Sequence, residues 1–489
     1  MNNVILLVLI FLPMAAGVLL PVLRMGDRRK KLAFLTAVLT VEAACAALLL
    51  TRDSAGLTLL TMTEELTVAF RLDGASKLFI TLSAFGFLPV GVYAFRYMEH
   101  SERENSFFAF FLLSQGALIG MDLAANLITM YLFFELVTLL SMPLVLHDRT
   151  EESVRAALKY LFYSVAGAFL ALGCIFFLSR YTITMNFTPG GALDMSLAAG
   201  HEGLLLTVVF LGVVGFGAKA GMYPLHGWLP TAHPVAPAPA SAVLSAVITK
   251  AGVLAILRVI YYCVGVDFLR GTWVQKGWLT LSLLTVFMGS MMAYREKVLK
   301  KRLAYSSVSQ ISYVLTGLFL LTAEGVLGGL LHVVFHAGVK ICLFLVAGSF
   351  IVNLGKHRVD ELNGVGKAMP KTLWCWTAAS LALVGIPPFS GFVSKWYLAL
   401  GALDAGLGVF DVLIPVVLLI SALLTAGYLL PVTIRGFFPG KGFESPRRND
   451  EGGAVMWMPV ALFAASALLL GLFAGPLAGW ISGLAGTLV

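Results

Sequence analysis

Long apolar stretches separated by short polar segments dominate the sequence. A run of about 20 mostly apolar residues is long enough to cross a bilayer as a helix, and fourteen such runs can be marked. They lie at about 4–23, 32–51, 77–95, 106–121, 124–147, 159–178, 203–223, 236–262, 277–294, 303–323, 325–353, 372–400, 408–434 and 455–487. The two longest gaps, 52–76 and 179–202, are too short for a soluble domain. The pattern therefore predicts an all-α polytopic membrane protein with about fourteen transmembrane helices.

The composition supports this class. The chain of 489 residues is 59% hydrophobic and only 12% charged, with a mean hydropathy of +0.90, whereas soluble domains are about half apolar and a quarter charged. The basic cluster near the N-terminus follows the first apolar run instead of preceding it, which indicates a spanning helix and not a secretory signal. The five cysteines lack CxxC spacing, so neither a disulfide framework nor a zinc site is expected.

Lysines and arginines are unevenly distributed between the connections. Of the 34 in the chain, 23 follow odd-numbered helices and six follow even-numbered helices. Because cytoplasmic loops carry the excess of positive charge, we expect the odd-numbered connections in the cytoplasm. The protein is then predicted to lie in the cytoplasmic membrane with both termini outside.

Five cations remain, and they fall within the predicted spans. They are Lys219, Lys250, Arg258, Lys340 and Lys395. A lysine near the bilayer centre costs roughly 2.5–3.5 kcal/mol on insertion scales, so each cation needs an explanation. Snorkelling to the headgroups from a helix end is one explanation, and it remains open for Arg258 above all. A role in ion transport is the other.

The first of two predicted helix breaks lies in "GFGAKAGMYPLHGWLP", residues 215–230. Pro224 and Pro230 remove backbone donors and interrupt the helix, and Lys219 stands five residues before Pro224. Irregular backbone at membrane depth is tolerated only where it is buried in protein or lines a wet cavity.

The second break lies in "LALVGIPPFSGFVSKW", residues 381–396, and repeats the arrangement. Gly385, Pro387 and Pro388 interrupt the helix, and Lys395 follows. Interrupted helices in corresponding halves of a membrane protein indicate an ion pathway at a repeat interface. A helix kink without a role in transport is the alternative.

Glu135, in "ITMYLFFELVTLLSMPLVL", is the one carboxylate deep in an otherwise unbroken span. Burial of a lone carboxyl or ammonium favours its neutral form. A Glu–Lys pair lets both groups stay charged and makes the protonation of each depend on the other, as a proton relay requires. Glu42 in the second span has no supporting feature, and we interpret it as a polar helix-packing residue.

Three titratable residues stand on one helix face in "LLHVVFHAGVKICLFL". His332, His336 and Lys340 are spaced at i, i+4 and i+8, and histidine titrates near neutral pH. We favour a proton relay over hydrogen-bonded core histidines. Haem ligation would need histidines facing the iron from opposite sides, and zinc-site spacing is absent.

No catalytic residue, metal or cofactor of the chain's own is expected. The sequence has no cysteine cluster for iron–sulfur ligation and no dinucleotide-binding motif. A membrane-embedded enzyme would lack a credible nucleophile or metal set.

With these residues identified, the chain resembles the antiporter-like membrane subunits of respiratory complex I, of membrane-bound hydrogenases and of Mrp-type cation/proton antiporters. The likeness runs from about residue 70 to 435. Five ordered blocks carry it: "FFELVTLLS", "GFGAKAGMYPLHGWLPTAHPVAPAPASAVLSAVITKAGV", "KKRLAYSSVSQISY", "LLHVVFHAGVKICLFLVAGS" and "GIPPFSGFVSKW".

The resemblance implies a fourteen-helix fold with broken seventh and twelfth helices. Two inverted five-helix repeats would comprise residues 106–262 (helices 4–8) and 277–434 (helices 9–13). The first three helices (1–105) and a C-terminal helix (455–489) would flank them.

The resemblance also implies roles for the residues of a proton path. These residues are Glu135, Lys219, Lys250, His332, His336, Lys340 and Lys395, with His226 in support. Glu135 would pair with Lys219, the following residues would form an axis at mid-membrane depth, and Lys395 would be the exit group. Protons or sodium ions would pass through two half-channels joined by this axis.

The implied partners are sister membrane subunits and a peripheral redox arm, with no nucleic acid. The segment "TAHPVAPAPAS" is more similar to complex I and hydrogenase subunits than to Mrp subunits. We therefore expect a pumping, non-redox subunit of a redox-driven complex. The large subunit of an Mrp-type Na+/H+ antiporter is the alternative.

Overall fold

The computed structural model describes residues 2–23, 27–63, 66–440 and 451–489. Four basic residues that contribute to the predicted orientation, Arg24, Lys441, Arg447 and Arg448, lie outside the described residues.

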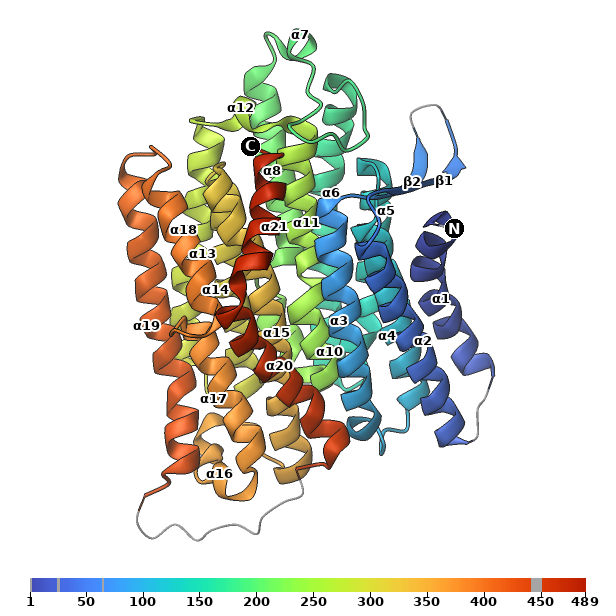
Figure 1. Ribbon diagram of the computed structural model, residues 1–489, viewed down its shortest axis with the longest axis vertical. Coiled ribbons are helices and arrows are strands. Elements are labelled where there is room, and N and C mark those ends of the chain that lie inside the picture. The colour runs from blue at the N-terminus through green and yellow to red at the C-terminus, as the bar shows by residue number, and fades with distance from the viewer. Residues whose placement is uncertain (1, 24–26, 64–65, 441–450) are drawn as a thin grey trace.

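Most of the described chain is helical, and the long helices run side by side along the longest axis of the molecule (Figure 1). The first part contains α1 (Asn2–Val22), α2 (Arg28–Leu50), α3 (Gly74–Tyr97), α4 (Glu104–Asp122), α5 (Leu127–Val145), α6 (Glu151–Tyr181), α7 (Met195–Ala198), α8 (Glu202–Ala220) and α9 (Leu229–Val235). The central part contains α10 (Ala238–Val243), the π-helix η1 (Leu244–Ile248), α11 (Lys250–Arg258), the π-helix η2 (Val259–Val264), α12 (Val266–Leu269), α13 (Trp273–Arg295), α14 (Leu299–Phe319) and α15 (Ala323–Leu354). The last part contains η3 (Val359–Leu362), α16 (Val365–Ala368), α17 (Pro370–Val384), α18 (Ser390–Leu403), α19 (Val409–Phe437), α20 (Ala454–Leu472) and α21 (Ala474–Gly486).

Eleven helical segments in the described residues are long and apolar enough to cross a membrane. Three of the fourteen predicted spans are not among them. Runs 106–121 and 303–323 correspond to α4 and to the serine-rich α14, and run 372–400 divides into α17 and α18, of 15 and 14 residues. The all-α membrane fold is thus confirmed, while eleven spans, not fourteen, meet the length and hydropathy criterion.

Both termini lie toward the same end of the molecule, the end that also carries α7 and α12 (Figure 1). The gap at 52–76, for which no structure is predicted from the sequence, contains an antiparallel hairpin of β1 (Ala55–Thr61) and β2 (Thr67–Leu72). The hairpin pairs Ala55 with Leu72 and Thr61 with Thr67. Its strands, of seven and six residues, are too short to produce a run of spanning length.

The two predicted helix breaks are present, and they share one construction. Each begins with a glycine at positive φ after the last helical residue: Gly221 at 82° after α8, and Gly385 at 92° after α17. Glycine adopts this left-handed conformation without the steric cost of a side chain. Pro224 lies inside the first break, but Pro230 belongs to the first turn of α9 and so starts the second half of this helix. Pro387 and Pro388 lie in the second break.

The second break is also closely packed. A Cβ atom at Gly391 would lie 1.9 Å from the Ala382 carbonyl oxygen, and one at Gly471 of α20 would lie 2.1 Å from the Pro388 carbonyl oxygen. Only glycine lets the two half-helices and α20 approach this closely.

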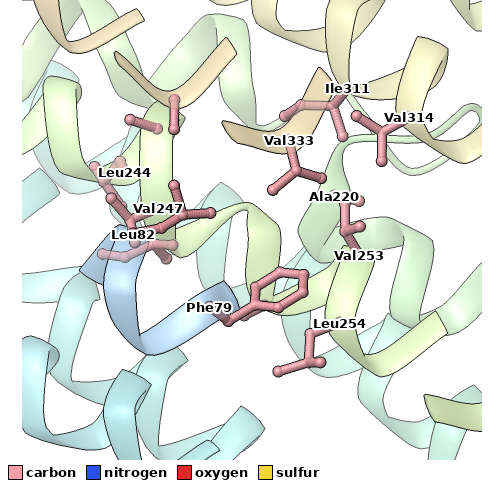
Figure 2. Close-up of a cluster of buried hydrophobic side chains, with 14 of the residues drawn as sticks. Phe79, Leu82, Ala220, Leu244, Val247, Val253, Leu254, Ile311, Val314 and Val333 are labelled. Atoms are coloured by element: carbon pink, nitrogen blue, oxygen red, sulfur yellow. The ribbon is translucent and has the colours of Figure 1, made fainter. Parts of the chain in front are cut away.

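Two spans form the centre of the molecule. The continuous segment Ala238–Val264, from α10 to η2, is 100% buried in its most apolar window, and α15 is 89% buried. Figure 2 shows part of the surrounding apolar cluster, in which Phe79 and Leu82 of α3, Leu244 and Val247 of η1 and Val333 of α15 are labelled. The two most enclosed spans are thus the ones that carry Lys250 and the histidine stripe.

The Arg258 side chain is buried inside the protein at the start of α3. Its guanidinium donates two hydrogen bonds to the Asp73 carboxylate, at 2.6 and 2.9 Å, and lies over the rings of Phe187 and Tyr262. Asp73 is the N-cap residue of α3. Arg258 therefore joins the end of α11 to the start of α3 through a buried ion pair. The bidentate carboxylate of Asp73 supplies the hydrogen bonds that the guanidinium loses when it leaves water.

Candidate functional site

Lys219 lies at the C-terminal end of α8, directly before the first break, and its side chain is fully buried. Its Nζ donates to the hydroxyl of Thr138 on α5 and, at 3.2 Å, to the hydroxyl of Tyr160 on α6. The rings of Phe134 and Tyr160 lie 5.2 and 5.3 Å from Nζ. The ammonium is thus held by neutral groups from two neighbouring helices.

The expected contact between Glu135 and Lys219 is not formed. Among the ion pairs of the described residues, none joins these two side chains. Glu135 is half-buried on α5, whereas Lys219 reaches Thr138, which lies one turn further along the same helix. The Thr138 hydroxyl is therefore the group in direct contact with Lys219, while the charge of Glu135 acts on Lys219 from a greater distance.

The first break leaves helix-end carbonyls that need donors. Trp228, which is fully buried, donates its indole N–H to the Ala218 carbonyl oxygen at 2.8 Å. This bond supplies a donor to a carbonyl at the C-terminal end of α8 from a residue on the other side of the break. The Lys219 ammonium is therefore not needed as a donor to that carbonyl and binds the Thr138 and Tyr160 hydroxyls.

Lys250 begins α11 directly after the π-helical turn η1. Its Nζ donates to the Ser245 carbonyl oxygen at 2.8 Å and contacts His336 Nδ1 at 2.7 Å. A π-helical turn displaces carbonyls from their regular partners and is frequent at functional sites. The contact with His336 joins the two most enclosed spans of the protein.

The backbones of α8 and α11 touch at the level of the two lysines. A Cβ atom at Gly252 would lie 2.6 Å from the Ala220 backbone nitrogen. Ala220 is next to Lys219 in the chain, and Gly252 is two residues after Lys250. The close approach at Gly252 therefore brings the two lysine-bearing helix ends together.

The predicted histidine stripe is confirmed in its geometry. The rings of His332 and His336 stack with centroids 6.0 Å apart on one face of α15. His332 contacts the Ser394 hydroxyl through Nδ1 at 2.9 Å, and its Nε2 is 3.1 Å from the side-chain amide oxygen Oε1 of Gln310. Ser394 precedes Lys395 on α18, so the stripe leads to the second break.

Lys395 is held by the end of the preceding half-helix. Its Nζ donates to the carbonyl oxygens of Leu383 and Val384, the last two residues of α17, at 2.7 and 2.8 Å. Cations are stabilised at helix C-termini by these unpaired carbonyls. Nζ also lies 5.3 Å from the ring centroid of Tyr313, which in turn stacks on His332.

We call the residues Lys219, Lys250, His336, His332 and Lys395, in this order, the polar axis. Lys340 branches from it, since its Nζ donates to the Leu303 carbonyl oxygen at 3.0 Å. His226 stacks on Tyr223, with ring centroids 5.8 Å apart, in the first break.

Sequence reasoning overlooked the hydroxyl groups that accompany the axis. Four side chains of α14 form hydrogen bonds with α13 and α19. Toward α19, Ser306 accepts from the Tyr428 hydroxyl and Tyr313 donates to the Leu418 carbonyl oxygen. Ser309 bonds with both Ser290 of α13 and Ser421 of α19, and Thr316 bonds with Ser282 of α13. Gln310 and Ser307 of the same helix face His332 and Ser245. The serine-rich block "YSSVSQISYVLT" was a signal for this role, because serines are unusual in such number within one span.

The histidines and carboxylates do not gather as metal ligands do. Within the part of the chain that the structure describes, no three His, Cys, Asp or Glu side chains are grouped so that they could hold a metal ion.

Comparison with known proteins places this arrangement in a family. Residues 124–425, more than half of the chain, match the family described as NADH:quinone oxidoreductase/Mrp antiporter, TM. The chain belongs to this family. The matched residues contain every member of the polar axis together with Glu135 and both helix breaks.

Relatives in the NADH:quinone oxidoreductase/Mrp antiporter family come from several kinds of complex. NADH-quinone oxidoreductase subunit N of Desulforudis audaxviator is 36% identical over 408 residues, which cover 81% of this chain and 80% of the relative. Hydrogenase-4 component B of Escherichia coli is 33% identical over 359 residues, 68% of this chain but only 51% of the relative. A chain in the Mrp complex of Dietzia sp. shares the fold with a TM-score of 0.85 at 24% identity, over 99% of this chain and 98% of that one.

The bond across the first break gives a testable prediction. Trp228→Phe removes the indole N–H and leaves the Ala218 carbonyl oxygen only the longer bond from the Gly221 backbone N–H, at 3.2 Å. We expect the loss of one of its two hydrogen bonds to lower the free energy of unfolding by about 0.5–1.5 kcal/mol. Trp278→Phe is the matched control, because this indole is equally buried but lies 3.4 Å from its acceptor, the Phe210 carbonyl. Denaturant unfolding of the purified protein in detergent measures both. Equal losses in the two variants would show that the bond across the break contributes nothing.

Proposed function

We propose that this chain is the proton-translocating membrane subunit of a complex I-related, redox-driven pump of the NADH-quinone oxidoreductase or membrane-bound hydrogenase type. The observation that carries the proposal is the polar axis. Its members from Lys250 to Lys395 are connected through His336, His332 and Ser394, and Lys219 lies on a helix whose backbone packs against the one that carries Lys250. Four of the five have almost no exposed surface. Intramembrane ionisable groups are expensive and mark ion pathways.

In this proposal, Lys219 is the group that loads the axis. The Thr138 and Tyr160 hydroxyls solvate its ammonium without fixing its proton, since both are neutral. The charge state of Glu135, one turn before Thr138 on α5, then changes the stability of the ammonium through space and not through a direct bond. A pair separated in this way remains coupled because a low-dielectric interior strengthens the interaction between charges.

Transfer along the axis uses the two ring nitrogens of histidine. The Lys250 ammonium can pass a proton to His336 Nδ1 across their 2.7 Å contact. His336 Nε2 is buried without a hydrogen-bond partner, so release of the proton from Nε2 requires a water molecule or a rotation of the ring to supply the acceptor. The next ring, His332, is stacked beside it and leads through Ser394 to Lys395. Imidazole suits this transfer because its charge changes near neutral pH.

The hydroxyl groups between α13, α14 and α19 are our candidate for the half-channel of the second half of the molecule. Ser290, Ser309 and Ser421 lie within 2.6–3.3 Å of one another, and Tyr313 links this column to His332 and Lys395. The matching half-channel would lie beside Lys219. We assign residues 106–262 and 277–434 to the two inverted repeats that contain them.

The proposed partners are sister membrane subunits and a peripheral redox arm, which would supply the energy for transport. The 36% identity to an NADH-quinone oxidoreductase subunit over most of both chains supports the redox-driven type. The second candidate is the large subunit of an Mrp-type Na+/H+ antiporter, favoured by the fold similarity to a chain of the Mrp complex. Transport driven by electron transfer separates the two: an Mrp-type subunit would exchange ions without it.

Lys219→Arg tests the role of the axis. Arginine keeps the cation but holds its proton, because its pKa exceeds about 12, so we expect normal assembly and at least a tenfold loss of proton transport. Glu135→Gln should also reduce transport, through the lost charge coupling. The measurement is proton uptake into inverted vesicles or proteoliposomes of the assembled complex, with the electron-transfer rate recorded in the same preparation. Transport at the wild-type rate in the arginine variant would reduce Lys219 to a fixed counter-charge.

We also propose that the protein lies in the cytoplasmic membrane with both termini outside, supported by the cation distribution and by the position of both termini at one end of the molecule (Figure 1). Cysteines introduced at two exposed positions, Lys297→Cys in the predicted cytoplasmic loop and Thr487→Cys near the C-terminus, test it. In intact cells, a membrane-impermeant maleimide should label position 487 and not position 297. The reverse pattern would invert the topology.

A further inference from the structure

An apolar groove lies on the side of α15 that faces away from the polar axis. It consists of two cavities of about 300 and 400 Å³ that share the lining residues Thr81, Leu82, Val334 and Leu477. Most of the wall comes from α3, α15, α20 and α21, with Leu50 at the end of α2 and Ser390 at the start of α18. Since the cavities have common walls, we treat them as one groove.

The groove follows α3 from its first turn toward the middle of the membrane. Its lining starts at Lys77 and continues to Gly86. At 1.5 Å per residue this is about 13 Å of helix, which is comparable to the length of one acyl chain within one leaflet. Phe463 of α20 and Ile341 of α15 line the deep end.

Small side chains hollow out the deep part of the groove. Gly86, Gly338, Ala337 and Ala467 line it beside larger apolar residues. A Cβ atom at Gly338 would meet only Ser466 Oγ at 3.3 Å and Phe463 Cδ1 at 3.8 Å. The atoms that line an empty apolar cavity lack van der Waals contacts on one side. An apolar group that fills the cavity restores these contacts and so stabilises the protein around it.

The shallow end of the groove has a different chemistry. Lys77 and the partly exposed Trp480 line it, and Arg52 lies two residues after the lining residue Leu50. Within the described residues, Lys77 takes part in none of the ion pairs. Tryptophan is enriched at the level of the headgroups, and basic side chains at that level attract anionic lipids.

We propose that this groove binds one anionic phospholipid, with an acyl chain between α3 and α15 and the phosphate at Lys77. The order of the lining argues for this occupant. A cation and an indole lie at the shallow end, and a mainly apolar wall, interrupted by the hydroxyls of Thr81, Ser390 and Ser466, continues to the deep end. This lipid would support α15 from behind, on the face opposite the one that holds His332 and His336. The proposal does not depend on proton transport.

The chain offers a closely matched control on another helix. Lys77 and Thr81 stand in the first turns of α3, where the Thr81 hydroxyl donates to the Lys77 carbonyl at 2.7 Å. Lys276 and Thr280 stand likewise in the first turns of α13, with the same bond at 2.8 Å, but neither lines the groove. Changes at the two pairs alter charge and bulk equally.

The experiment uses the full-length protein, alone and in its native complex, in phosphatidylcholine nanodiscs. These contain a trace of a photoactivatable lipid whose acyl chain carries a diazirine, either phosphatidylglycerol or phosphatidylcholine. After irradiation, mass spectrometry quantifies adducts on α20 and α21. We expect phosphatidylglycerol to give at least fivefold more adducts than phosphatidylcholine. Lys77→Gln should remove this preference, and Thr81→Phe or Leu477→Trp should remove the adducts of both lipids.

Lys276→Gln and Thr280→Phe should leave the labelling unchanged. Three results would overturn the proposal. The first is equal labelling by the two lipids in the unmodified protein, which means unspecific surrounding lipid. The second is labelling that persists in both groove-filling variants. The third is labelling of the isolated chain that disappears in the complex, which means that a partner's helix occupies the groove.

Discussion

An ammonium group inside a bilayer must be solvated by the protein, and this constraint explains the irregular parts of the fold. Regular helices keep their carbonyls paired within the helix and offer little to a buried cation. Lys395 binds the free carbonyls at the end of α17, and Lys250 binds a carbonyl of the π-helical turn η1. The second break and the π turn thus supply carbonyls to two of the buried lysines, whereas Lys340 uses the Leu303 carbonyl of α14 and Lys219 uses hydroxyl groups.

The two breaks look alike in sequence but treat their lysines differently. In the first break, the Trp228 indole donates to a carbonyl oxygen at the end of α8. The Lys219 ammonium donates to hydroxyl groups of α5 and α6, which are weaker acceptors than backbone carbonyls. In the second, Lys395 itself satisfies the end of α17. Lys219 is consequently the less firmly held cation, which is the property expected of a group that exchanges its proton with a changing partner charge.

Sequence reasoning succeeded where a local rule determines the geometry. The spacing of His332 and His336 fixed their common face, and glycine and proline marked both interruptions. Contacts between distant parts of the chain were expected only where the family resemblance implied them, as for Lys250 and the histidine stripe 86 residues away. The partner of Arg258, 185 residues away, was not predicted. The replacement of Glu135 by Thr138 beside Lys219 depends on the rotation of α5 about its axis, which no pattern within one helix reveals.

The central claim is that ions cross the middle of the protein along one axis through the contact between Lys250 and His336. Lys250→Met, with Lys276→Met as the surface control, tests it most directly in proteoliposomes of the assembled complex that report internal pH. The account predicts that Lys250→Met abolishes proton accumulation while the complex still assembles, and that the control accumulates protons as the unmodified protein does. Undiminished accumulation in the Lys250→Met variant would contradict the account, because ions would then cross by another route.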